Sequence, residues 1–220
     1  MKMAAQGTTL LSILDSINND VLENSPPVGV SPHLWSVTLE LIVENGIGER
    51  RDGKIYFGAS DRVRIAMFAA SLVQDLGKVS SKLSWQDFES FVSEIAEHYD
   101  YITKNDVKVS KPRVQIDVIA SKGSFCIAMD CKHWSKAAGG SGLDEIAKKQ
   151  AKRAKIFLQS KHGRKYVVAL PAIITLLAGA SKSAAGVPIV PISEINSFFE
   201  NIEGYLDEYL LMTKKRRNDK

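Results

Sequence analysis

Two apolar segments separated by four small or polar residues constrain the fold of this 220-residue chain more than any other feature. The segments are Val114–Ala120 and Phe125–Lys132, and the sequence Ser121-Lys122-Gly123-Ser124 lies between them. Strand-forming runs of this length around a turn that contains glycine predict two adjacent antiparallel strands. We therefore expect a β-hairpin at the centre of the fold.

The register of this hairpin determines which side chains share a face. If the turn has four residues, Ala120 pairs with Phe125, and Asp117 lies opposite Ala128. Because side chains alternate between the two faces of a strand, Asp130 and Lys132 are expected on the same face as Asp117. The other face is expected to point into a second layer and to carry Val114, Ile116, Val118, Phe125, Ile127, Met129 and Cys131.

Segments with helical and strand periodicity flank the hairpin. An apolar stripe that begins after Ser84 predicts a helix before it, and a second, basic helix is expected over residues 144–158. Two apolar runs, 166–170 and 187–192, predict further strands, and a last amphipathic helix is expected over 194–212. This order predicts an α/β sandwich with a mixed sheet.

The first 80 residues are expected to form a separate, winged-helix-like domain. Helices are predicted over residues 9–22, 34–43 and 61–76, and Asp52-Gly53 predicts a tight turn between two short strands. The basic residues of this hairpin would contact DNA; they are Arg50, Arg51 and Lys54. Solvated charges without a ligand, or a winged helix that binds protein, are the alternatives.

The expected domain boundary is the polar stretch 77–82. A second domain over residues 81–212 and a basic tail over residues 213–220 would follow it.

Asp117, Asp130 and Lys132 together indicate chemistry on a phosphate group. Neighbouring carboxylates repel one another unless a cation or a proton lies between them, and a site with only oxygen ligands suits Mg²⁺ or Mn²⁺. A lysine beside them can stabilise charge on a scissile phosphate or help to activate water. The hairpin alone leaves open the alternative of a purely structural Asp130–Lys132 ion pair.

With its flanking helices, the hairpin resembles the PD-(D/E)xK nuclease superfamily, in which an acid in one strand is followed by a (D/E)-x-K motif at the end of the next. The matching segments are Gln115-Ile116-Asp117-Val118-Ile119 and Asp130-Cys131-Lys132. The resemblance covers about residues 84–192 and is greatest to Mrr-type restriction endonucleases and archaeal Holliday-junction resolvases. Ile116 departs from the pattern, because a proline commonly precedes the first acid.

The resemblance implies a restriction-endonuclease-like fold and metal-dependent hydrolysis of a DNA phosphodiester that leaves a 5′-phosphate. Asp117 and Asp130 would be the metal ligands, and a homodimer would cut the two strands. Glu89, next to the aromatic Phe88, would contact the metal or its water. A non-catalytic DNA-binding protein on the same fold and an RNA-processing nuclease are the alternatives.

The helix after the hairpin carries further candidates. Gln150 interrupts its apolar stripe, so this side chain contacts the metal-bound water or DNA, or else forms a plain buried hydrogen bond. The remaining face is expected to contact phosphates; it carries Lys148, Lys149, Lys152, Arg153 and Lys155.

Bulk composition adds little beyond this pattern. The net charge is only +4, and the two cysteines lack the spacing of a zinc site. The longest apolar stretch is too short to cross a membrane, and no signal peptide heads the chain. We therefore expect a cytoplasmic protein without a membrane partner.

Overall fold

The computed structural model describes residues 2–134, 141–179 and 181–214. The chain divides into two compact units, residues 1–91 and 92–220. Residues 135–140, which precede the helix predicted over residues 144–158, and most of the basic tail lie outside the described residues. None of the described helices is both long enough and apolar enough to span a membrane.

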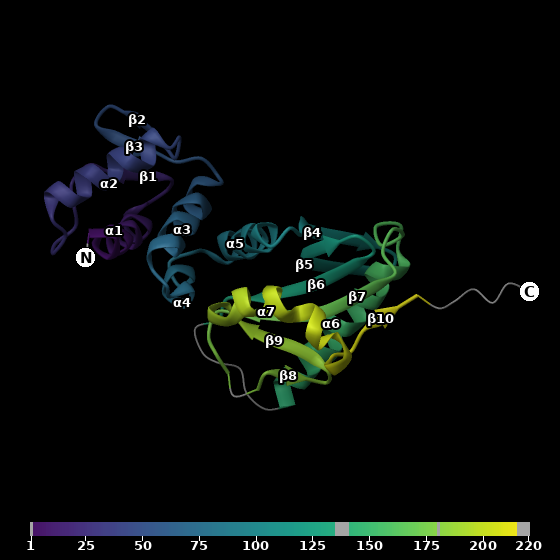
Figure 1. Cartoon of the computed structure of the whole chain (residues 1–220). Helices are drawn as coiled ribbons and strands as arrows, with labels where there is room; N and C mark the ends of the chain where they lie inside the picture. The colour runs from purple at the N-terminus through teal and green to yellow at the C-terminus, as the bar shows by residue number, and fades with distance from the viewer. Residues whose placement is uncertain (1, 135–140, 180, 215–220) are drawn as a thin grey trace, which may run out of the picture. The chain divides into compact units, whose positions relative to one another are not determined.

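The first unit combines helices with a small antiparallel sheet whose strand order is β1-β3-β2 (Figure 1). Its elements are α1 (Lys2–Ser16), β1 (Val21–Glu23), α2 (Pro32–Glu44), β2 (Glu49–Arg51), β3 (Lys54–Tyr56), α3 (Asp61–Leu72) and α4 (Leu76–Ser80). The turn between β2 and β3 forms at Asp52 and Gly53, with φ angles of 46° and 74°. Positive φ at both positions is the geometry expected of an Asp-Gly hairpin turn.

Two predicted helices of this unit end earlier than expected. The first ends at Ser16, because Asn19 and Asp20 take positive φ angles of 48° and 61° and reverse the chain into β1. Asn and Asp tolerate this conformation better than other side chains with a Cβ atom. The third helix ends at Leu72, and the expected polar boundary contains α4, whose first turn is capped by Asp75.

The second unit contains a mixed sheet whose described strands have the order β4-β5-β6-β7-β9-β8, and β10 also pairs with β7. Its elements are α5 (Trp85–His98), which begins in the first unit, β4 (Ile102–Ser110), β5 (Arg113–Lys122), β6 (Phe125–Lys132), α6 (Ser141–Gln159), β7 (Val168–Thr175), β8 (Ser183–Ala184), β9 (Val187–Pro191), η1 (Ile192–Glu194), α7 (Ile195–Asn201), η2 (Ile202–Glu208) and β10 (Met212–Thr213).

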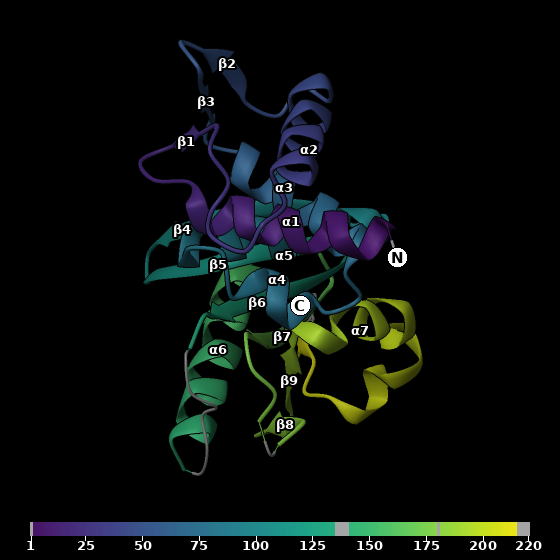
Figure 2. The ribbon, with the colours of Figure 1, turned by 90° about the vertical axis from the view of Figure 1, so that its left-hand side faces the viewer.

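Strands β4, β5 and β6 are antiparallel, whereas β6, β7 and β9 are parallel. Helix α6 is the crossover between the parallel strands β6 and β7, and α6 and α7 lie on opposite sides of the sheet (Figure 2). The predicted mixed sheet flanked by helices is therefore confirmed.

The predicted register of the β5–β6 hairpin was wrong by two residues. Lys122 pairs with Phe125, and Ile119 rather than Asp117 lies opposite Ala128. The turn has two residues, Gly123 and Ser124, because Gly123 takes a φ of 58° that permits a tight reversal. A shift of two residues preserves the predicted alternation of side chains between the two faces within the β5–β6 pairs.

The apolar face toward α6 holds the core around the hairpin. Ile119, Cys126, Ala128 and Ala169 of the sheet pack against Ala154, Phe157 and Leu158 of α6. Ile116 joins this cluster, although it was expected on the other face. The β4–β5 ladder skips the pair of Asp106 and Asp117, and Asp106 has a φ of 50°, so the regular alternation is interrupted there.

Three further segments differ from their predictions. Strand β4 was not predicted, and β7 covers residues 168–175 instead of 166–170 and includes Pro171. The last long helix is replaced by η1, α7, η2 and β10.

Candidate active site

Asp130 lies near the carboxyl end of β6 and is only 2% exposed. Its Oδ1 accepts a hydrogen bond from Arg153 Nη1 of α6 at 2.8 Å. Lys132 Nζ lies 2.7 Å from Oδ2, within ion-pair distance, but Oδ2 accepts no hydrogen bond from the described residues. Two cations thus neutralise one buried carboxylate, and one of its oxygens keeps unused acceptor capacity.

Asp117 lies on the neighbouring strand β5 and is tied to the same motif. Its Oδ2 accepts a 2.8 Å hydrogen bond from the backbone N–H of Cys131, the residue between Asp130 and Lys132. Burial raises the pKa of Asp117, and the negative charge of Asp130 adds to the rise. The Cys131 N–H, Lys132 and Arg153 lower the pKa, although the net effect is a raised pKa. Asp117 and Asp130 are thus close enough for their charges to interact unfavourably.

Gln150 is completely buried on α6, and its Nε2 donates a 2.7 Å hydrogen bond to the carbonyl oxygen of Ala128. A buried hydrogen bond was one of the two interpretations of this residue. Its Oε1 has no hydrogen-bond partner among the described residues. Buried acceptors are rarely left unused, so this oxygen is available to a donor that enters the site.

Arg153 is the residue whose position was not anticipated. It was expected among the phosphate-facing cations of α6, but its guanidinium binds Asp130. The spacing in the sequence could have indicated that Arg153 lies on the same face of the helix as Gln150. Residues three apart on a helix are neighbours, and Arg153 follows Gln150 by three.

The other predicted cations of α6 remain on the surface. Lys149, Lys152 and Lys155 are exposed, and Lys148 lies 3.7 Å from Glu145 in an exposed pair. In the first unit, Arg51 pairs with Glu49, and Lys54 lies 2.7 Å from Glu23, whereas Arg50 is exposed. Two of the three hairpin cations are therefore already close to a carboxylate.

Glu89 is half-buried on the part of α5 that belongs to the first unit. Across residues 2–134, 141–179 and 181–214, no three His, Cys, Asp or Glu side chains form a group that could hold a metal ion. Glu89 belongs to the first unit and Asp117 and Asp130 belong to the second, and the role of Glu89 stays a prediction.

The donor set around Asp117 and Asp130 nevertheless fits a hard divalent cation. Mg²⁺ is commonly held by one or two carboxylates while water molecules fill its remaining positions. Burial is the main cause of the raised pKa of Asp117, and a cation between Asp117 and Asp130 would offset both this desolvation of the carboxylate and the smaller repulsion from Asp130. The unused acceptor capacity of Asp130 Oδ2 is a second feature in favour of such a ligand.

The comparisons with known proteins match the segment of the chain that carries these residues. Residues 80–155 match the family model Mrr_cat, described as a restriction endonuclease. An uncharacterised protein from Archaeoglobus fulgidus is 30% identical over 130 residues, which cover 58% of this chain and 98% of the relative. The matched segment contains Asp117, Asp130, Lys132, Gln150 and Arg153.

Two solved structures are also similar. Protein VC1899 from Vibrio cholerae matches 94% of this chain at 11% identity, with a TM-score of 0.44. AF1548, a protein of unknown function, matches 50% of this chain at 19% identity, with a TM-score of 0.38. The chain spans 52% of the first structure and 59% of the second.

Proposed function

Because this chain belongs to the restriction-endonuclease family of the Mrr type, we propose that it is a divalent-metal-dependent DNA endonuclease that hydrolyses phosphodiester bonds. The observation that carries the proposal is the buried Asp130, which is held by Lys132 and Arg153 beside the second carboxylate of Asp117. A structural ion pair alone would not require the nearby carboxylate of Asp117, because a like charge makes the pair less favourable.

In this proposal Asp117 and Asp130 bind Mg²⁺ or Mn²⁺, and Glu89 contacts the cation or a water molecule. The cation, when bound, would polarise the phosphate and lower the pKa of a water molecule. The hydrogen bond from Cys131 N–H fixes Asp117 Oδ2, so this carboxylate is oriented before any ligand arrives. Gln150 would offer its free Oε1 as an acceptor to a water molecule or to DNA.

Lys132 is proposed to stabilise negative charge on the scissile phosphate or to help activate the water. Its side chain is 25% exposed, whereas that of Asp130 is 3% exposed, so the ammonium can reach a substrate while the carboxylate stays buried. An ammonium positioned before the reaction stabilises charge that develops in the transition state without reorganising solvent.

The domain assignments complete the proposal. Residues 1–80 would form a winged-helix-like domain that selects the substrate through Arg50, Arg51 and Lys54, and residues 81–212 would form the nuclease domain. The basic tail over residues 213–220 would contact DNA. A cytoplasmic homodimer would cut both strands in repair, recombination or restriction.

The proposal is tested by incubating the purified protein with linear, flapped and four-way DNA in the presence of Mg²⁺ or Mn²⁺. Asp130→Ala and Lys132→Ala are the matched variants, and Lys182→Ala, which changes an exposed lysine outside α6 and outside the candidate site, is the control. We expect cleavage by the wild type and the control, and loss of cleavage without loss of DNA binding in the two site variants.

Two results would replace the DNA endonuclease proposal with one of its alternatives. If the wild type binds DNA but cleaves none of these substrates, the chain is a non-catalytic DNA-binding protein on this fold. If RNA is cleaved in preference to DNA, the chain is an RNA-processing enzyme. Equal cleavage by the wild type and both site variants would point to a contaminating nuclease.

A further inference from the structure

A cavity of about 520 Å³ lies beside the candidate active site, against the end of the β4–β5 hairpin. The charged residues that line it are all cations, namely Lys108, Arg113 and Arg153, and Ser110 and Gln115 add polar groups. Arg153 is also the residue that binds Asp130. The cavity therefore adjoins the catalytic carboxylates through a shared side chain.

The cations of this cavity can still accept a ligand. Arg153 contacts Asp130 through Nη1, and a guanidinium has five N–H donors, so its other donors are available to a ligand. Arg113 is exposed and forms no ion pair with any residue in the described part of the chain. Lys108 lies 2.5 Å from Asp106, but both side chains are largely exposed, so solvent screens this pair.

The positive character extends along β4. Lys108 also lines a neighbouring cavity of about 410 Å³, to which Lys104 and His162 contribute. Asp106 is the one acid that lines this second cavity. Cations in succession along one strand suit a ligand with repeated negative charges, such as a nucleic-acid backbone.

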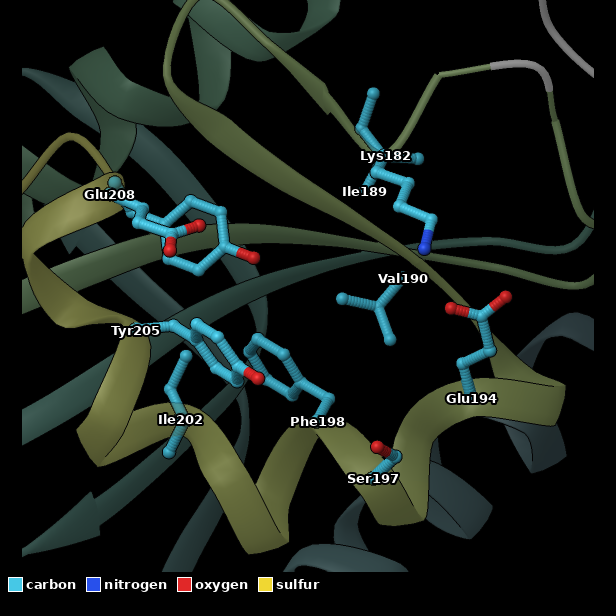
Figure 3. A pocket seen from close by; sticks show the side chains of 10 residues that line it. Lys182, Ile189, Val190, Glu194, Ser197, Phe198, Ile202, Tyr205 and Glu208 are labelled. Atoms are coloured by element: carbon cyan, nitrogen blue, oxygen red, sulfur yellow. The ribbon is translucent and has the colours of Figure 1, made fainter.

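A third cavity in the same unit provides a contrast. It also measures about 520 Å³, but Lys182 shares its lining with two carboxylates, those of Glu194 and Glu208 (Figure 3). Its other lining side chains include the aromatic rings of Phe198 and Tyr205. A phosphodiester would meet two like charges there, whereas all the charged residues that line the cavity at the end of the β4–β5 hairpin are cations.

We propose that the cavity lined by Lys108, Arg113 and Arg153 binds a phosphate group of the DNA backbone next to the scissile phosphate. Arg113 provides the main contact, and Arg153 contacts this phosphate while its Nη1 holds Asp130. The inference rests on the proposed nuclease function and adds to it a second contact point, which positions the backbone relative to Asp117 and Asp130. A phosphate contact of this kind fixes register and orientation and carries no base sequence.

The test measures binding of the full chain to a fluorescein-labelled DNA duplex by fluorescence anisotropy in EDTA, so that no cleavage occurs. Arg113→Ala and Lys108→Ala are compared with the wild type and with Lys182→Ala, which removes a lysine from the cavity with two carboxylates. We expect each of the first two variants to weaken binding by about fivefold, the size of an exposed ion pair. The slope of log affinity against log salt should fall by about 1 for each lost phosphate contact.

Arg113→Lys provides the rescue variant, because it keeps the charge and should restore most of the salt slope. Inorganic phosphate serves as a competitor, and it should displace DNA only weakly, because a single ion cannot replace the repeated charges of the backbone. If the wild type binds DNA but Arg113→Ala and Lys108→Ala match it in affinity and slope, the cavity assignment is wrong and the nuclease proposal stands. If the wild type binds no DNA, both are wrong.

Discussion

Asp61 in the first unit and Asp130 in the second are both buried carboxylates, but their surroundings differ. Asp61 Oδ2 accepts hydrogen bonds from the backbone N–H groups of Gly48 and Gly58 at 3.1 and 2.8 Å. Its Oδ1 accepts one from Arg64 at 3.1 Å. Both oxygens of Asp61 are therefore used, whereas Oδ2 of Asp130 accepts no hydrogen bond from the described residues.

The surroundings of the two acids indicate different roles. Arg64 also donates to the carbonyl oxygens of Asn45 and Gly46, so Asp61 and Arg64 together join the end of α2 to the start of α3. Asp130 instead has the second carboxylate of Asp117 nearby, which gives it no structural benefit. A buried acid with all its acceptors used stabilises the fold, whereas a buried acid with unused acceptors and a like charge beside it is suited to bind a ligand.

The largest effect is expected from Asp130→Asn. Loss of this charge removes a proposed metal ligand worth several kcal/mol of transition-state stabilisation, so the cleavage rate should fall by about 10³-fold. The midpoint of urea unfolding should change little, because the side chains of Lys132 and Arg153 are 25% and 38% exposed and can be solvated. Cleavage assays and unfolding curves on the same preparation test both parts. If the Asp130→Asn protein still cleaves DNA at the wild-type rate, Asp130 is not a metal ligand and does not differ in role from Asp61.

Asp61→Ala should lower the stability and leave the cleavage rate nearly unchanged, which is the reverse of the effect expected of Asp130→Asn. It leaves the N–H groups of Gly48 and Gly58 without their acceptor, which is expected to lower the free energy of unfolding by about 1–3 kcal/mol. Asp61→Asn, which keeps an acceptor oxygen, should cost less. Urea unfolding measures the loss, and cleavage per folded molecule should stay near that of the wild type. A large loss of cleavage with unchanged stability would contradict the structural role.

The raised pKa of Asp117 predicts a pH-dependent difference in stability from Asp117→Asn in metal-free buffer. The folded state holds the proton of Asp117 more tightly than the unfolded chain does. The extra free energy of unfolding that the wild type has over Asp117→Asn is therefore fully present below the ordinary pKa of 3.8. It is lost as the pH rises through the higher pKa of Asp117 in the folded protein. The slope is limited to about 1.4 kcal/mol per pH unit. Unfolding curves between acidic and neutral pH measure it, and a relative stability of the wild type that rises with pH would refute the sign.

The smallest effect is expected at the hairpin of the first unit. Arg50→Ala combined with Arg51→Ala should leave stability unchanged, because both side chains are exposed, and should weaken DNA binding by less than about fivefold. Anisotropy titrations at two salt concentrations measure this change. A much larger loss of affinity would make the first unit, and not the catalytic unit, the principal DNA-binding surface.

Sequence periodicity was sufficient to predict the β5–β6 hairpin, although not its register, because the apolar alternation of a half-buried sheet is a strong signal. Strand β4 was missed for the opposite reason. It is an edge strand in which only Val107 and Val109 are buried, so charged residues obscure its alternation. Pro171 similarly concealed the extent of β7, which runs through it.

The ion pair between Arg153 and Asp130 joins residues 23 positions apart, on a helix and a strand. Helical spacing could have assigned Arg153 to the face of Gln150, but not to a partner on β6. That partner depends on how the crossover after β6 returns α6 over the sheet. The roles of Glu89 and of the surface lysines of α6 stay predictions.

The two-residue turn at Gly123 and Ser124 limits how the hairpin can vary in evolution. A slip of one residue between β5 and β6 would move Asp130 and Lys132 to the opposite side of the sheet from Asp117. A slip of two residues would preserve the faces, but it would move Asp117 about 7 Å along the sheet, away from the N–H of Cys131. The short turn therefore sets both the face and the spacing of the site residues, and a change in its length is expected to disrupt the site.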